Sequence, residues 1–129
     1  MATITVTLNV KTTKLQYKKD VDLYCSFAGM ANGANPELFT TKVESGDTLV
    51  WNGVSIDTQG DQADTVEIID ITRYGGNKIL SNFSHPSSST VSCTVSGEKF
   101  MWQKYNIFFT INKDNTKKYK IDPIINIHK

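Results

Sequence analysis

The sequence lacks long apolar runs, carries only two cysteines and has little net charge, and each shortage excludes a class of protein. No stretch approaches the roughly 18 consecutive apolar residues of a membrane-spanning helix, so we expect no membrane partner. The segment Met1 to Lys14 shows no basic region followed by an apolar run, so we expect no signal peptide. Together these features favour a cytoplasmic protein.

The expected cytoplasmic location also determines how the two cysteines, Cys25 and Cys93, are interpreted. In a reducing compartment they should be free thiols that behave as small buried hydrophobes. A disulfide between them is the alternative, and it requires export by a route that leaves no signal in the sequence.

The net charge of +1 argues against nucleic-acid binding, but the charges are unevenly distributed along the chain. Residues 20–70 hold ten acidic side chains and one lysine, whereas the remaining residues hold thirteen basic and three acidic side chains. If this segregation persisted in space, the surface would be dipolar. We expect mixing instead, because segments that follow one another in sequence often become neighbours in the fold.

A chain of 129 residues with 39% hydrophobic content can form one domain, residues 1–129. Such a domain buries roughly two thirds of the surface of its unfolded chain. The clearest strand pattern is Thr3 to Val10, in which polar and apolar residues alternate strictly. The same alternation predicts a strand at Val21 to Phe27. Gly29 to Pro36 is rich in turn-forming residues and is expected to be a loop.

The stretch Gly46 to Trp51, which reads GDTLVW, is expected to lie at the centre of the core. Its glycine permits a tight turn, Asp47 can bond the turn backbone, and β-branched and aromatic residues follow as in a buried strand. The strand continues to Ile56, either straight or folded into a hairpin at Asn52-Gly53. Its expected partner is the last apolar block, Tyr105 to Ile127.

Further strands are predicted where apolar runs are separated by turn residues. In Thr65 to Tyr74 the apolar phase shifts between Ile68 and Ile69, which predicts a β-bulge. Pro123 cannot donate to a strand ladder and is expected at an edge or a bulge. Short strands without a helical period predict an all-β fold, a two-layer and mostly antiparallel β-sandwich. The remaining predicted strands are Glu37 to Val43, Lys78 to Phe83, Thr90 to Val95 and Tyr105 to Ile111, with a loop at residues 85–89.

No combination of residues predicts catalysis, so we expect a protein that is not an enzyme and that uses no metal or other cofactor. A blue-copper site needs a histidine close after its cysteine, and none lies between Cys93 and Met101. The acidic loop Asp57 to Asp64 offers oxygen ligands for calcium, but its spacing is not that of an EF-hand. A solvated acidic loop is the preferred interpretation. Serines near His85 lack the G-x-S-x-G context of a nucleophile.

One binding hypothesis arises from the residues themselves. Trp102 and Tyr74 lie near turn signals and could form a platform that stacks against a glycan, as in a lectin. Packing in the core or at its rim is the alternative and the commoner outcome for aromatic side chains. The lysines that flank Tyr119 are interpreted as charged residues that disfavour pairing of a strand edge with another chain, and so prevent aggregation.

Several segments, taken in their order along the chain, form a family pattern. They are Gly46 to Trp51, Val54-Ser55, Thr65 to Ile71, the turn Gly75-Gly76 and the ending Tyr119 to Ile125. Together they resemble the bacterial inclusion-body protein family of the PixA/AidA type. The resemblance implies a cupredoxin-like or immunoglobulin-like β-sandwich, no known catalytic residues and cytoplasmic accumulation in bacteria.

The leading hypothesis from the sequence is therefore a non-enzymatic inclusion-body protein. We expect it to self-associate as a homo-oligomer through exposed strand edges and charged surfaces. A lectin-like binding module on the same β-sandwich is the alternative.

Overall fold

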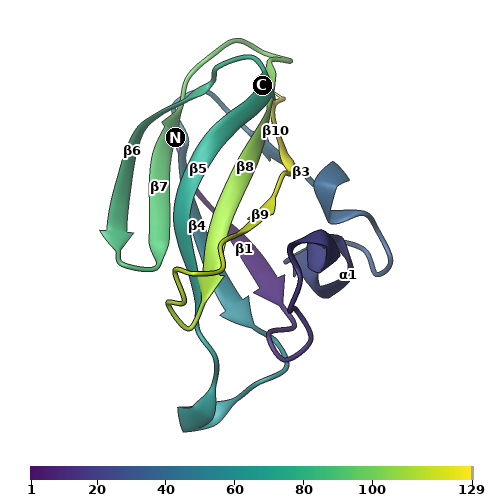
Figure 1. Ribbon diagram of the computed structural model, residues 1–129. Coiled ribbons are helices and arrows are strands. Elements are labelled where there is room, and N and C mark those ends of the chain that lie inside the picture. The colour runs from purple at the N-terminus through teal and green to yellow at the C-terminus, as the bar shows by residue number, and fades with distance from the viewer. Residues whose placement is uncertain (129) are drawn as a thin grey trace.

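Two β-sheets pack face to face in the computed structural model, which describes residues 1–128 (Figure 1). Sheet A has the strand order β2-β1-β4-β7-β6, and sheet B has the order β3-β10-β8-β5, with β9 paired to β8. Most neighbouring strands are antiparallel, while β1 pairs with β4 and β3 with β10 in parallel. The predicted all-β sandwich is confirmed.

The bounds of the elements are as follows. Sheet A consists of β1 (Thr3–Val10), β2 (Cys25–Phe27), β4 (Thr48–Ser55), β6 (Leu80–Ser87) and β7 (Thr90–Val95). Sheet B consists of β3 (Thr40–Val43), β5 (Val66–Gly76), β8 (Trp102–Ile111), β9 (Tyr119–Ile121) and β10 (Ile124–Ile127). The helical turns are η1 (Lys18–Asp20), α1 (Val21–Tyr24), η2 (Pro36–Leu38) and η3 (Gly60–Gln62).

The centre of the core is a contact between Trp51 on β4 and Tyr105 on β8. Both side chains are fully buried, and their ring centroids lie 5.5 Å apart in an edge-on arrangement. The indole Nε1 donates a 3.0 Å hydrogen bond to the Tyr105 hydroxyl. Burial raises the pKa of Tyr105 above its usual range, so this hydroxyl stays protonated. The expected packing of Gly46 to Trp51 against the last apolar block is confirmed.

The hairpin considered at Asn52-Gly53 does not form, because β4 continues straight through both residues. All eight residues of β4 pair in parallel with β1. The glycine is required for a different reason, since a Cβ atom at Gly53 would lie 2.4 Å from Cγ1 of the buried Val66. Gly53 therefore permits a close approach between β4 and β5 rather than a turn.

The strand predicted at Val21 to Phe27 is wrong in its first half, which forms helix α1. Val21 is buried, whereas Leu23 is 70% exposed. On a strand these two residues would share a face, but on a helix they point in different directions. Only Cys25–Phe27 forms a strand, β2, which pairs with the end of β1.

The strand predicted at Glu37 to Val43 begins later, at Thr40, because a 3-10 turn precedes it. The Asn35 side chain accepts a 3.0 Å hydrogen bond from the amide of Glu37 and caps this turn. Pro36 occupies the first position of the turn, where its missing N–H costs nothing. The Asn-Pro pair was thus a start signal for a helical turn.

The bulge predicted between Ile68 and Ile69 is confirmed by a register shift in the pairing of β5 with β8. A second shift, between Arg73 and Gly75, was not predicted. The loop predicted at residues 85–89 is wrong in its first part, because β6 extends to Ser87 as an irregular edge strand.

Both cysteines are free and buried, as expected. Burial raises the pKa of the Cys25 and Cys93 thiols to about 12, so neither is a ready nucleophile. Strands from the acidic segment, residues 20–70, lie beside strands from the rest of the chain, so the charges mix within the sheets as expected. Within residues 1–128, no helix has the length and apolar character needed to cross a membrane.

Candidate functional site

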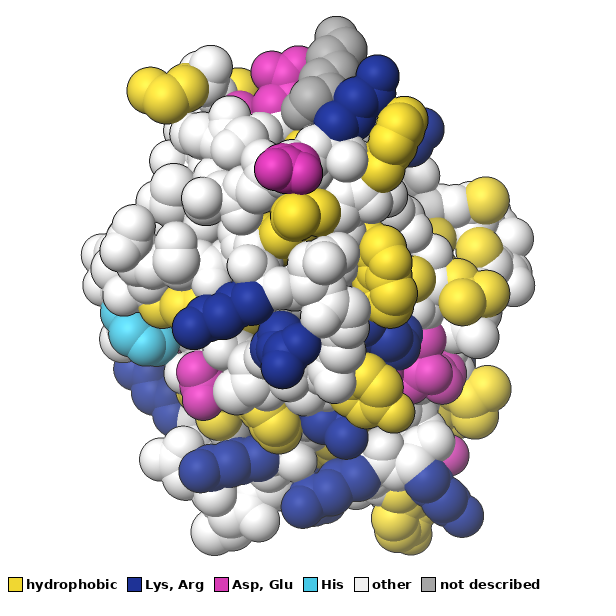
Figure 2. All heavy atoms as spheres, turned by 90° about the horizontal axis from the view of Figure 1, so that it is seen from above, with side chains coloured by type: hydrophobic (Ala, Val, Ile, Leu, Met, Phe, Trp, Pro, Cys, Tyr) yellow, Lys and Arg dark blue, Asp and Glu magenta, His cyan; other side chains and the backbone are white. Residues whose placement is uncertain are grey.

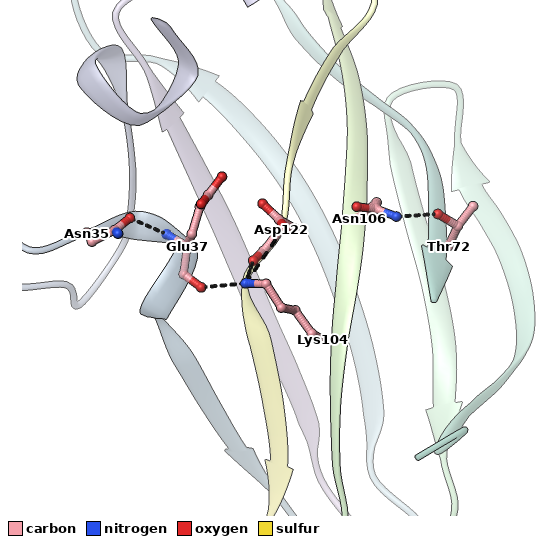
Figure 3. Close-up of polar contacts among 6 residues, drawn as sticks. All are labelled: Asn35, Glu37, Thr72, Lys104, Asn106 and Asp122. Carbon is pink, nitrogen blue, oxygen red and sulfur yellow. Dashed lines mark hydrogen bonds and ion pairs between the residues drawn. The ribbon is translucent and has the colours of Figure 1, made fainter. Parts of the chain in front are cut away.

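A polar network on sheet B connects three segments that are distant in the sequence (Figure 3). The Lys104 ammonium, on β8, donates hydrogen bonds to the main-chain carbonyl oxygens of Glu37 at 2.9 Å and Asp122 at 2.5 Å. Its Nζ atom also lies 3.8 Å from the Asp122 carboxylate. The lysine therefore holds the η2 turn and the connection between β9 and β10 against β8.

Three carboxyl groups surround this lysine, and two of them have raised pKa values. A hydrogen bond with the Asp122 side chain raises the pKa of Glu37 to about 7, and burial and the neighbouring negative charges add to the effect. Burial and then the charge of Asp122 raise the pKa of Asp22. Near neutral pH, the Glu37 carboxyl is therefore partly protonated. The Glu37 carboxyl can bind and release a proton near neutral pH. Lys104 joins the η2 turn and the connection between β9 and β10 to β8, so the main role of the network is to stabilise the fold.

Trp102 and Tyr74, the glycan platform proposed from the sequence, are exposed on adjacent strands at one end of sheet B. Trp102 is 45% exposed at the start of β8, and Tyr74 is 61% exposed near the end of β5. The indole lies across Gly76, where a Cβ atom would come within 2.8 Å of the ring. The structure therefore places neither aromatic side chain in the core.

The surface at this end mixes apolar and charged side chains. Figure 2 shows hydrophobic side chains dispersed among polar ones, with most of the lysine and arginine side chains in the lower half of the view. Phe100 is 70% exposed, and the Lys99 ammonium lies 4.9 Å from its ring centroid. The apolar side chains on this face are dispersed among polar ones and are not joined in one large apolar patch, as is usual for protein surfaces.

The acidic loop Asp57 to Asp64 is bonded to neighbouring loops. Asp57 accepts hydrogen bonds from the hydroxyl and amide groups of Thr13, and Asp64 accepts from Asn112 and Thr12. The Thr13 hydroxyl lowers the pKa of Asp57 most, and the Asn112 amide lowers that of Asp64 most. Within residues 1–128, no group of three histidine, cysteine or acidic side chains is arranged to hold a metal ion.

A buried carboxylate that the sequence analysis did not single out lies at the other end of sheet B. Glu67, on β5, is only 3% exposed. Its Oε1 atom accepts hydrogen bonds from the Thr110 hydroxyl at 2.9 Å and the Lys113 amide at 2.7 Å. Its buried Oε2 atom accepts no hydrogen bond from any residue within 1–128. An unpaired buried acceptor costs about 1–3 kcal/mol. The available sequence signal was an acidic residue inside an apolar run.

A cavity of about 500 Å³ lies beside this carboxylate. Its walls come from the end of β4, the start of β5, the connection between β6 and β7, and Lys113. Glu67 and Asp64 both contribute to the lining. The Oε2 atom of Glu67 is shielded from solvent, so the cavity has space for a small molecule but does not present this oxygen to it.

Comparisons with known proteins identify a shared fold. No protein-family model matches the chain, and no curated protein matches its sequence. The crystal structure of the inclusion body protein PixA from Burkholderia cenocepacia is similar, with a TM-score of 0.71 and 12% sequence identity. The similarity covers 98% of this chain and 94% of that one. The β-sandwich expected from the family resemblance is confirmed by this match.

Proposed function

We propose that the chain is a non-enzymatic, cytoplasmic protein of the inclusion-body type that self-associates as a homo-oligomer. The observation that supports this proposal is the fold shared with the Burkholderia inclusion body protein over nearly the whole of both chains. Identity of fold does not by itself determine function, so the proposal also depends on what the side chains offer.

The described side chains support a role without catalysis. Both thiols are buried and have pKa values of about 12. The Lys104 ammonium is bonded to two carbonyl oxygens and lies close to a carboxylate. These groups stabilise the fold, and they are poorly suited to attack or protonate a substrate.

The end of the sandwich opposite the chain termini offers a surface for self-association (Figure 1). There, the loops at residues 11–20 and 112–118 lie side by side, because the Lys117 ammonium donates a 2.9 Å hydrogen bond to the carbonyl of Gln16. Thr12 and Thr13 connect the acidic loop at residues 57–64 to the same end. The exposed lysines of these loops are Lys11, Lys14, Lys18, Lys19, Lys113, Lys117 and Lys118.

A symmetric contact between two copies would pair opposite charges at this end. The lysine-rich loops of one copy would face the acidic loop of the other, and the reverse pairing would occur in the same interface. Attraction between exposed charges is screened over about 8 Å at physiological ionic strength. Assembly of this kind should therefore weaken as salt is added.

Light scattering across a salt titration tests self-association directly. At about 50 mM salt we expect a mass of at least two chains, falling toward the 14.4 kDa of one chain at about 500 mM. Asp61→Lys reverses an exposed charge in the acidic loop and should shift the transition to lower salt. Glu98→Lys makes the same change at the end near the termini and should leave the transition in place. A single-chain mass at every salt concentration would contradict the proposal.

A glycan-binding module is the second candidate, and the exposure of Trp102 and Tyr74 on adjacent strands favours it. On a glycan array, Trp102→Ala should reduce binding by about tenfold, because one stacking aromatic ring contributes on the order of 1 kcal/mol or more. Phe83→Ala removes a similarly exposed ring from sheet A and should not change binding. Equal binding by the Trp102→Ala variant and the wild type would reject this candidate.

A further inference from the structure

We propose that residues 29–38, in the connection between β2 and β3, form a flap that a proton on the Glu37 carboxyl keeps docked against sheet B. The flap is docked in mildly acidic solution and is released as the pH rises to neutrality and above. This proposal does not depend on self-association or on glycan binding, because it concerns a different edge of the molecule and a different set of side chains.

The first argument is that the flap is attached to the sandwich at few points. In Figure 1 it projects beside α1, and within it only Pro36 is buried. Among residues 1–128, one hydrogen bond links its main chain to a residue outside 27–40, the bond that the Glu37 carbonyl accepts from Lys104. At its start, Gly29 has a φ of +88°, and a Cβ atom placed there would meet nothing within 4 Å. The flap can therefore move about Gly29 without displacing a strand.

The second argument is that the Glu37 side chain meets carboxyl groups on elements outside the flap. It lies within hydrogen-bonding reach of Asp122, between β9 and β10, and of Asp22, on α1. Figure 3 shows Glu37 and Asp122 beside the Lys104 side chain. A hydrogen bond between two carboxyl groups needs a proton, because a carboxylate is only an acceptor. A protonated Glu37 therefore joins the flap to sheet B, and an ionised Glu37 does not.

The third argument is the charge around Glu37. The charged groups that face it are Asp22 on α1, Asp122 beside β10 and Lys104 on β8. Asp122 is only 8% exposed, so water screens its charge weakly. The Lys104 ammonium already donates to two carbonyl oxygens and lies 3.8 Å from the Asp122 carboxylate. Ionisation of Glu37 would place three carboxylates beside one ammonium, and their repulsion would push the flap away from the sheet.

The direction of the pH effect follows from the pKa of Glu37. The hydrogen bond with Asp122, and then burial and the neighbouring negative charges, raise this pKa from 4.5 to about 7 while the flap is docked. In the released flap the carboxyl is exposed, so its pKa returns toward the ordinary value. The docked state thus binds the proton more tightly than the released state. Docking is therefore lost as the pH rises from 4.5 to about 7, and it changes little above that range.

A cavity of about 460 Å³ shows that the flap is not closely packed on the elements beside it. The walls of this cavity include residues 30–34 of the flap and residues 22–26 of α1 and β2. Asp22 belongs both to this lining and to the carboxyl cluster around Glu37. Release of the flap would therefore open the cavity to solvent.

Cleavage by chymotrypsin after Leu38 measures release of the flap, because a protease cuts a segment that is detached from the fold. The rate at each pH is divided by the rate on a short peptide with the same cleavage sequence, which removes the pH dependence of the protease. The protein is kept at a concentration at which light scattering gives the mass of one chain. We expect the ratio to rise at least about tenfold from about pH 5.5 to about pH 8.5.

Two variants and one internal reference separate this effect from a general loosening. Glu37→Gln retains a side-chain donor and cannot ionise, so its ratio should stay low and vary by less than about twofold over the same range. Glu98→Gln removes an exposed carboxylate elsewhere and should keep the rise of the wild type. Cleavage after Phe100, which is 70% exposed between β7 and β8, should not depend on pH once corrected in the same way.

A second measurement is the NMR titration of the Glu37 carboxyl carbon, whose midpoint should lie at about 7. A ratio that does not rise with pH would overturn the proposal. So would equal rises after Leu38 and Phe100, or the rise of the wild type in Glu37→Gln. If Glu37→Gln does not fold, the titration decides, since a midpoint at the ordinary value of 4.5 would mean that Glu37 holds no proton near neutral pH.

Discussion

Replacement of Trp51 by alanine is expected to lower the free energy of unfolding by about 4 kcal/mol. The indole is fully buried against Tyr105, and its removal leaves a cavity that the surrounding strands cannot close. It also removes the donor that pairs with the Tyr105 hydroxyl. Since small domains have stabilities of about 5–15 kcal/mol, the loss is a large share of the total. Urea unfolding followed by far-UV circular dichroism measures it.

The matched control is the other tryptophan of the chain. Trp102 is 45% exposed, so its replacement by alanine should cost no more than about 1 kcal/mol. Tyr105→Phe keeps the ring contact and leaves the indole N–H without its acceptor, so its cost should lie between the two, at about 2 kcal/mol. Similar losses for Trp51→Ala and Trp102→Ala would show that the centre of the core has been wrongly placed.

The sequence was sufficient to predict a strand and its bounds where the strand has one buried and one exposed face. Strands β1 and β7 have the predicted bounds, and the bulge near Ile68 was visible as a break in the alternation. The pattern failed where one signal has two physical causes. Val21 to Tyr24 alternates like a strand but forms a helical turn, and Gly53 resembles a hairpin glycine but permits contact with Val66.

The candidate sites were less predictable because their contacts are non-local. The hydrogen bond from Lys104 to Glu37 joins residues 67 positions apart, and the one from Lys113 to Glu67 joins residues 46 positions apart. A pattern within a short stretch of sequence cannot predict a contact between residues so far apart in the chain. Trp102 and Tyr74 could be singled out as aromatic residues near turns, but only the structure shows that both are exposed on adjacent strands.

Replacement of Asp47 by alanine is expected to lower the free energy of unfolding by about 3 kcal/mol. This residue precedes β4 and is 3% exposed. Its two carboxylate oxygens accept 2.9 Å hydrogen bonds from the amides of Ala2 and Glu44, which join the start of β1 to the turn before β4. Asp47→Asn keeps only one acceptor oxygen and should lose about half as much. Asp61→Ala, at an exposed acidic residue, should change stability by no more than about 0.5 kcal/mol.

The contribution of Asp47 should also depend on pH, with a sign fixed by the direction of its pKa shift. The amide of Glu44, and then that of Ala2, holds the pKa of Asp47 below the usual value of 3.8. The ionised form therefore stabilises the fold above that value, and this stabilisation is lost as the pH falls through the lower, folded-state pKa. The difference in unfolding free energy between the wild type and Asp47→Ala should be constant from about pH 5 to 8 and should narrow below about pH 4. If the difference in unfolding free energy stays unchanged down to about pH 2, the contacts of the Asp47 side chain, and not its charge, stabilise this turn.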